Sequence, residues 1–315
     1  MMKKFILQII IFGIGLLGAA LGADYTISKN LRKPTTSQML SNWNNIYSGK
    51  IQSDVVIMGS SRAWVQYSPH ILDSILGINS YNLGIDGSPI NRQIIVYDTY
   101  RRFNPKPKWI IQDIDFGTIN KRNGYRREQF FPYFFDDSLK KAITEYEKYN
   151  LLETCFPIYR YAGYNELVKI GLGLIKFGET DLVKGYSGKN KEWDGKKFKE
   201  QKEIFYAQDS AMLSLFDKYL ARAYSENIKV IFVYAPMYIG ATEKVINIEG
   251  MYQMYDSIAQ KYDIPILDYN YNPISYDTAY FYNAMHLNKK GSELFSIKLA
   301  HDIDSLGIIL RLENR

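Results

Sequence analysis

The sequence contains a single cysteine, Cys155, and three histidines among 315 residues. One cysteine excludes an intramolecular disulfide and a cysteine metal cluster, and its apolar surroundings in LLETCFPIY predict a buried, unreactive thiol. The chain has no HExxH or CxxC motif and no histidine pair at ligand spacing, so we expect no metal site. It also lacks GK[ST] and the glycine fingerprint of nucleotide-binding folds, so we expect no nucleotide or other cofactor.

Runs of one charge are also missing. The net charge is +6 and the pI is about 9.0, but the basic residues are dispersed. No block reaches the roughly five or six consecutive like charges of a nucleic-acid-binding arm. We therefore expect no nucleic-acid partner, and we interpret the excess as a solvated surface that can face acidic glycans or a membrane.

The N-terminus carries the only long stretch without charges. Phe5–Ala23 contains nineteen uncharged residues after Lys3 and Lys4, which is long enough to cross a bilayer. We predict that residues 1–23 are an uncleaved membrane anchor, with the lysines inside and the rest of the chain in the periplasm or outside the cell. The alternative is a cleaved signal peptide and a secreted protein, because small residues precede position 24.

The remaining chain alternates short apolar runs with helical patterns. With 46% hydrophobic residues it can form a substantial core. Residues 24–50 are predicted to be a linker containing a short helix at 37–46, and residues 51–315 an α/β domain. The predicted strands are 54–58, 79–83, 108–114, 228–234 and 264–268, and the main predicted helices are 138–149, 161–175, 201–225, 241–262 and 288–306. This pattern predicts a doubly wound three-layer α/β/α fold with a mostly parallel five-stranded sheet. We interpret residues 116–200 as an insertion, or cap, over the active face.

The first predicted strand ends in Gly59-Ser60-Ser61-Arg62. Ligands bind at the carboxyl ends of strands in such sheets, and a serine there can present its hydroxyl and its backbone N–H to the same crevice. The alternative is that both serines only cap the following helix. The stretch is not the G-x-S-x-G elbow of α/β-hydrolases, because the second glycine is missing.

A catalytic serine usually needs a histidine as general base. His70 and His301 are predicted to lie on the surface, near the start of the first helix and in the last helix. His286 stands in YFYNAMHLNKKGSELFS, in a loop after the last strand and before the last helix. This loop can reach the edge of the sheet where the first strand ends, so His286 is the candidate base.

Three segments in this order resemble the SGNH (GDSL-like) hydrolase superfamily, in particular its membrane-anchored cell-envelope branches. They are Gly59-Ser60-Ser61, Asn82-Leu83-Gly84-Ile85-Asp86-Gly87, and Asn283-Ala284-Met285-His286-Leu287-Asn288-Lys289-Lys290-Gly291. The resemblance implies that Ser61 is the nucleophile and one oxyanion donor, and that Gly87 gives a second donor through its N–H. It also implies that His286 is the base, with Asn283 at the position of the residue that orients it.

Two departures from the family pattern concern catalysis. Asn283 replaces the usual Asp; it can hold an imidazole but cannot supply the negative charge that stabilises imidazolium. Asp277 is a possible substitute, with Asp268 a weaker one. After the third strand the family places an asparagine as an oxyanion donor, whereas this chain has Asp113 and Asp115. An ionised carboxylate there would repel an oxyanion, unless it binds Arg62 or a sugar hydroxyl.

The resemblance implies an extracytoplasmic serine esterase or O-acyltransferase. Its substrate would be an acylated, in particular acetylated, envelope polysaccharide or a small ester, processed through a Ser-His acyl-enzyme. The two departures motivate an alternative, a weak or inactive relative that binds glycan or scaffolds an envelope assembly. A third hypothesis is an unrelated doubly wound envelope protein in which the serine turn is only a helix cap.

Overall fold

The structure is a computed structural model that describes all residues except 34–37, 121–125, 176–182, 196–197, 199–201 and 308–315. The chain divides into two compact units. The first comprises Met1–Asn44 and Asn123–Thr180, and the second comprises Asn45–Arg122 and Asp181–Arg315. These divisions differ from the boundaries expected at residues 23 and 50, and most of the 116–200 insertion groups with the N-terminal segment.

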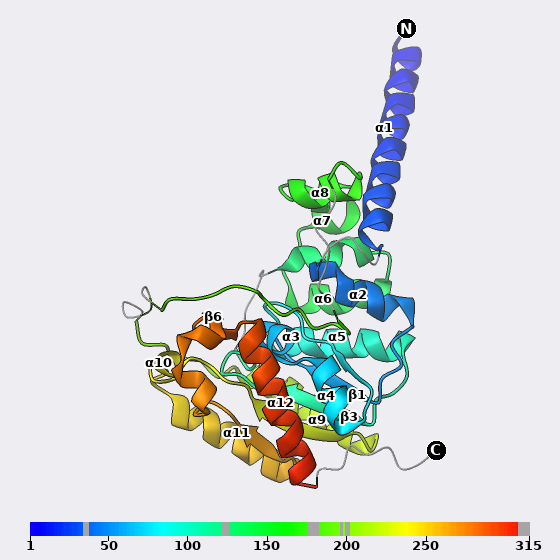
Figure 1. Cartoon of the computed structure of the whole chain (residues 1–315). Helices are drawn as coiled ribbons and strands as arrows, with labels where there is room; N and C mark the ends of the chain where they lie inside the picture. Colours follow the sequence, from blue (N-terminus) through cyan, green and yellow to red (C-terminus); the bar gives the residue numbers. More distant parts are fainter. Residues whose placement is uncertain (34–37, 121–125, 176–182, 196–197, 199–201, 308–315) are drawn as a thin grey trace. The chain divides into compact units, whose positions relative to one another are not determined.

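The second unit contains the five-stranded sheet (Figure 1). Its strands are β1 (Val55–Met58), β2 (Ser80–Asn82), β3 (Trp109–Asp113), β4 (Lys229–Tyr234) and β5 (Ile266–Asp268). They are all parallel, in the order β2-β1-β3-β4-β5. The predicted α/β class is confirmed. Because β2 and β3 lie on opposite sides of β1, the strand order reverses between β1 and β3, which is where doubly wound folds bind ligands.

Helices cover both faces of this sheet, which explains the near-continuous apolar runs. They are α3 (Ser61–Gln66), α4 (Pro69–Leu76), α5 (Ile90–Phe103), α9 (Ser210–Ser225), α11 (Ile248–Tyr262) and α12 (Lys289–Ser305). On one face Val55 and Ile57 join a core with Phe295 of α12. On the other, Phe232 packs against Phe216 of α9 at 5.6 Å between ring centroids.

The first unit is helical in its described part. It contains α1 (Met2–Leu31), η1 (Arg127–Tyr133), α6 (Asp137–Tyr146), α7 (Leu151–Cys155), η2 (Tyr159–Tyr161) and α8 (Asn165–Gly171), and α2 (Gln38–Ser48) crosses the boundary between the units. Its core is aromatic: Trp43 packs against Phe130 at 5.4 Å, and Phe131 against Tyr161 at 5.8 Å. Helix α1 is long and apolar enough to span a membrane, and its most apolar window has a mean hydropathy of 2.3.

Several predicted boundaries were wrong. The helix expected over 201–225 begins only at Ser210, because the Asp209 carboxylate accepts the backbone N–H groups of Ala211 and Met212 and caps it there. The helix expected over 241–262 is interrupted: α10 (Ile239–Thr242) and α11 are separate.

The region expected to be a linker, 24–50, is largely helical. Helix α1 continues to Leu31, and α2 occupies Gln38–Ser48. In the insertion, the helices expected over 138–149 and 161–175 are shorter, as α6 and α8. Cys155 was expected to be buried but is exposed, since it lies on α7, none of whose residues is buried.

Candidate active site

The turn after β1 is built around a close approach that only glycine permits. A Cβ at Gly59 would lie 2.6 Å from Ala63 Cβ and 2.8 Å from Asp113 Cβ. The next residue, Ser60, is the N-cap of α3, with its hydroxyl 3.4 Å from Arg62 N. Ser61 is the first residue of α3, so its N–H is one of the first-turn groups without a partner inside the helix. Of the two serines, Ser60 therefore has the capping role, and Ser61 Oγ is directed elsewhere.

Ser61 and His286, 225 positions apart in the chain, are hydrogen-bonded. Ser61 Oγ lies 2.8 Å from His286 Nε2, and His286 Nδ1 lies 2.9 Å from Asn283 Oδ1. The same Asn283 oxygen accepts the Met285 N–H at 2.9 Å. A backbone N–H can only donate, so the Asn283 oxygen faces both groups and Nδ1 must carry the imidazole proton. The lone pair of Nε2 then faces the Ser61 hydroxyl, as a general base requires.

His286 is held by a short hairpin rather than by the plain loop that was predicted. Strands β6 (Phe281–Asn283) and β7 (His286–Leu287) are antiparallel, with Asn283 opposite His286. Asn288 then caps α12 by accepting the Gly291 N–H at 3.0 Å. Tyr282 stacks on the imidazole, with ring centroids 5.3 Å apart and an interplanar angle of 14°. The His286 ring is thus held in place by the β6–β7 hairpin, which the first turn of α12 follows directly.

A cavity of about 290 Å³ opens beside the Ser61–His286 pair. Its lining comes from the segments after β1, β2 and β3, from Met285 and His286, and from the segment before α9, in which Ile204 forms an isolated β-bridge with Val245. The lining residues are Ser60, Ser61, Arg62, Gly87, Ser88, Pro89, Asp115, Phe116, Gly117, Ile204, Tyr206, Met285 and His286. The cavity therefore lies at the carboxyl edge of the sheet, where the fold predicts a ligand.

Asp115 lies in this cavity, where it binds the capping serine. Its Oδ2 accepts the Ser60 hydroxyl at 2.7 Å, and its Oδ1 accepts the Gly117 N–H at 2.6 Å. The bond between Ser60 and Asp115 joins the segments after β1 and β3 at the point where the strand order reverses. Both oxygens of Asp115 therefore accept hydrogen bonds from neighbouring segments of the protein.

Asp113 does not line the cavity. It is fully buried beneath Gly59, and its Oδ1 accepts the Tyr67 hydroxyl at 2.6 Å. Burial raises the pKa of this carboxyl from 3.8 to about 7, although the nearby Arg62 guanidinium favours the charged form. Asp113 thus supports the turn that carries Ser60 and Ser61.

Arg62 was one of two alternatives, beside a sugar hydroxyl, considered as the partner of Asp113 or Asp115. Its buried guanidinium instead donates to the carbonyl oxygen of Ala235, after β4. Burial, followed by repulsion from Arg62, lowers the pKa of His286 from 6.5 to about 4, and Asp115 opposes this shift. His286 is consequently neutral at pH 7, the form in which it can accept a proton.

Gly87 lines the cavity from the segment after β2. Its φ of +66° belongs to the left-handed region, which favours glycine. The guanidinium of the buried Arg92 donates to the Gly87 carbonyl at 3.0 Å and fixes this turn. Asn82, at the start of the same segment, donates to the carbonyls of Ala63 and Tyr67 at 2.7 and 2.9 Å, so its role is to join the segment to α3.

The remaining sequence candidates lie outside this arrangement. Asp277 accepts the Ala279 N–H at 2.9 Å and caps η4 (Thr278–Tyr280), and Asp268 accepts the Asn270 N–H at 2.8 Å. His70 and His301 are exposed, as predicted. Sequence reasoning missed Ile204 and Tyr206, which line the cavity, because it assigned them to the long helix or its margin. The Asp209-Ser210 capping signal could have located them outside that helix.

No group of three or more His, Cys, Asp or Glu side chains suited to a metal ion occurs in the described part of the chain. Comparison of the sequence with protein-family models and with curated proteins gives no match.

Three solved structures are similar in fold. The first is a candidate acylhydrolase from Bacteroides fragilis (14% identity, TM-score 0.42, 82% of this chain and 93% of that one). The second is an acetyl xylan esterase (12%, 0.40, 80% and 98%), and the third a candidate platelet activating factor from Streptococcus pneumoniae (11%, 0.42, 94% and 98%). At these identities the functional assignment depends on the geometry of the site itself.

Proposed function

We propose that the second unit is an SGNH-type serine esterase or O-acyltransferase that acts on acyl groups, in particular acetyl groups, of a cell-envelope polysaccharide. The observation that carries this proposal is the 2.8 Å contact between Ser61 Oγ and His286 Nε2, with Asn283 on the far imidazole nitrogen. The three groups come from two segments more than 200 positions apart and meet beside a cavity at the expected edge of the sheet.

In the proposed mechanism, His286 Nε2 removes the Ser61 proton while Oγ attacks the acyl carbonyl carbon. The carbonyl π electrons move to oxygen, and the resulting oxyanion lies near the N–H groups of Ser61 and Gly87. When the tetrahedral intermediate collapses, the C–O bond to the sugar breaks and the leaving oxygen takes the proton from His286. Water or another sugar hydroxyl, deprotonated by His286, then attacks the acyl-enzyme and regenerates Ser61.

The two departures from the family pattern lower the rate that we expect of this mechanism. Asn283 fixes the imidazole tautomer but contributes no negative charge opposite the imidazolium. The third oxyanion donor is absent from the segment after β3, and losing one such donor costs about 3–4 kcal/mol of transition-state stabilisation. We therefore propose a slow enzyme, selective for a substrate that it binds well, rather than a fast general esterase.

We further propose that α1 remains attached and anchors the protein, with Lys3 and Lys4 inside, and with the second unit and the part of the first unit that follows residue 23 on the outer side of the membrane. Helix α1 continues without a break through the small residues at 19–23. Its last turns belong to the folded first unit, where Ile27 and Leu31 are buried. The apolar stretch thus leads directly, within one helix, into the folded part of the first unit.

The test is covalent labelling of the full-length protein in detergent with a fluorophosphonate. We expect a label on Ser61 that requires the folded state, is lost in Ser61→Ala, and is retained in Ser60→Ala, which removes only the neighbouring hydroxyl. Hydrolysis of p-nitrophenyl acetate should follow the label across these variants.

The alternative function is a catalytically weak or inactive relative that binds glycan or scaffolds an envelope assembly. It is favoured specifically by Asn283 and by the missing asparagine after β3. An absence of both labelling and ester turnover in folded protein, together with binding of an acylated polysaccharide, would support this alternative and reject the enzyme.

A further inference from the structure

The first unit exposes apolar side chains on two short segments, α7 and the turn after α8. Leu151 is 75% exposed, Leu174 69% and Phe156 55%. Leu152, Leu172 and Ile175 are exposed as well, and α7 buries none of its residues. Single exposed apolar residues are ordinary on protein surfaces. Helix α7, and helix α8 from which the second turn follows, both contact η2. Six exposed apolar residues in two such segments form a patch, which usually marks an interaction site. We call these six residues the apolar patch.

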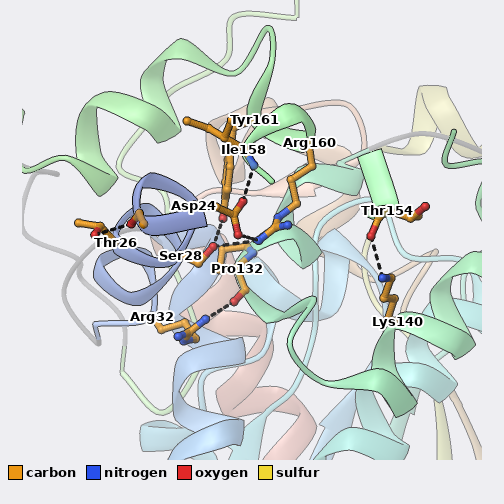
Figure 2. Close-up of polar contacts among 11 residues, drawn as sticks. Asp24, Thr26, Ser28, Arg32, Pro132, Lys140, Thr154, Ile158, Arg160 and Tyr161 are labelled. Atoms are coloured by element: carbon orange, nitrogen blue, oxygen red, sulfur yellow. Dashed lines mark hydrogen bonds and ion pairs between the residues drawn. The ribbon is translucent and has the colours of Figure 1, made fainter. Parts of the chain in front are cut away.

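The segment after α7 is fixed to the part of α1 that follows its apolar stretch (Figure 2). Asp24 accepts the Ile158 N–H at 2.9 Å and forms an ion pair with Arg160 at 2.6 Å. Ser28 Oγ lies 2.8 Å from Tyr161 Oη. These contacts hold the segment just after Phe156 against residues 24–28 of α1.

The second segment is held in the same way. The Asn30 side chain donates to the Gly171 carbonyl at 2.7 Å, and a Cβ at Gly171 would lie 2.6 Å from Ile27 Cγ2. Leu172 follows directly, so the turn bearing Leu172, Leu174 and Ile175 begins beside α1. Figure 1 shows α8 next to the lower part of this helix.

These contacts set the height of the patch relative to a bilayer. Nineteen residues of α1, 5–23, rise about 28 Å at 1.5 Å each, close to the roughly 30 Å of a hydrocarbon core. The hydrocarbon boundary then falls near Asp24, the residue that holds Ile158 and Arg160. Tyr25 follows Asp24 in the chain and Tyr159 follows Ile158, so both lie near this boundary. Both are exposed, and tyrosine is enriched where membranes meet water. Lys169 is exposed on α8 and can reach lipid phosphates.

We propose that the first unit is seated in the outer surface of the bilayer that α1 crosses, with the apolar patch inserted between headgroups and acyl chains. The occupant is lipid because the patch adjoins α1 and is accompanied by tyrosines. One of its segments is attached at the end of the apolar stretch, and the other is attached at Ile27 and Asn30, within about 9 Å of that end along the helix. This inference depends on the anchoring role of α1 proposed above, but not on catalysis. Seating would fix the orientation of the first unit, which a single spanning helix alone leaves free to tilt.

The exposed Cys155, the only cysteine of the chain, lies on α7 directly before Phe156 of the patch and provides the probe. Full-length protein would be labelled there with an environment-sensitive fluorophore and reconstituted into phosphatidylcholine–phosphatidylglycerol vesicles, with retention of α1 checked by intact mass. We expect quenching by lipids bearing a nitroxide near the headgroup, weaker quenching from a nitroxide at the chain end, and loss of quenching by aqueous iodide. The matched control is Cys155→Ser with Glu145→Cys, an exposed position on α6, which should be quenched by iodide alone.

Three outcomes would overturn the proposal. Iodide quenching at Cys155 equal to that at position 145 would place the patch in water. Protection from both quenchers would mean that protein, such as a second copy of the chain, covers it. Loss of α1 from the reconstituted protein would contradict the anchoring role of α1, on which this proposal depends. Replacing Leu151 and Leu152 with serine should reduce lipid quenching without changing the circular dichroism spectrum. Ser61→Ala should leave all quenching unchanged, so failure of the proposed enzyme function is separable from failure of this proposal.

Discussion

Replacing Asn283 with aspartate changes one side-chain group and supplies the negative charge that SGNH-type sites usually have. Asn283 Oδ1 already accepts both the His286 Nδ1–H and the Met285 N–H, each at 2.9 Å. A carboxylate oxygen accepts the same two donors, so the geometry should persist. What changes is the strength of the bond to the imidazolium that the proposed mechanism forms at His286.

The size of the effect follows from hydrogen-bond energetics. A neutral hydrogen bond contributes about 1 kcal/mol net, and one involving a charged group about 1.5–3 kcal/mol. If the difference appears in the transition state, Asn283→Asp stabilises it by about 1 kcal/mol, which corresponds to a rate increase of about fivefold. The carboxylate should also raise the pKa of His286 from about 4 toward its ordinary value.

The assay is kcat/KM for p-nitrophenyl acetate from pH 4 to 8, with full-length protein. We expect a higher plateau for Asn283→Asp and an acid limb displaced to higher pH. The control is Asp277→Asn, because the Asp277 carboxylate caps η4 and should not affect the rate. A slower Asn283→Asp enzyme, or a rate loss in Asp277→Asn, would refute the assignment of Asn283 as the residue that orients His286.

Three further predictions concern the same site. The wild-type kcat/KM should stay constant down to about pH 5 and fall near pH 4, because burial and Arg62 lower the pKa of His286 and only its neutral form accepts a proton; an acid limb near 6.5 would contradict this. The pKa of Asp113, raised to about 7, means that the folded state binds its proton more tightly than the unfolded state, so this group's stabilisation is lost as pH rises through 7. In the wild-type protein, the titration of Asp113 should lower the free energy of unfolding by about 3 kcal/mol between pH 5 and pH 8, and urea unfolding should show that Asp113→Asn abolishes this decrease. The contribution of His286 has the opposite sign, but it is the same in both proteins and cancels in the comparison. Gly59→Ala should destabilise the protein by about 1–3 kcal/mol through overpacking against Ala63 and reduce fluorophosphonate labelling; unchanged thermal unfolding would contradict the close approach.

The parallel sheet could be predicted because buried strands are short continuous apolar runs ending in turn residues. Val55–Met58 followed by glycine and serine is such a case. The sequence was enough to choose Ser61, His286 and Asn283 as candidate site residues. Parallel strands place their carboxyl ends at one edge of the sheet, and the segment around His286 has a recognisable spacing. The distances that bring these three groups together came only from the structure.

Other features depended on contacts that no local pattern contains. The first unit joins α1 to a segment more than 100 residues later through the Asp24–Arg160 pair, which the expected linker and insertion did not anticipate. Cys155 was expected to be buried because its neighbours are apolar, yet those neighbours are exposed. Apolar composition indicates removal from water, but it does not distinguish a protein core from a surface that faces lipid.

The central claim is that Ser61 forms a covalent acyl intermediate with the help of His286. Its most direct measurement is the mass of the folded full-length protein after rapid mixing with p-nitrophenyl acetate and acid quenching, followed by peptide mapping. We predict one acetyl group on the peptide containing Ser61, absent in Ser61→Ala and strongly reduced in His286→Ala. Acetylation at another residue, or none while the wild-type protein still releases p-nitrophenol, would contradict this mechanism.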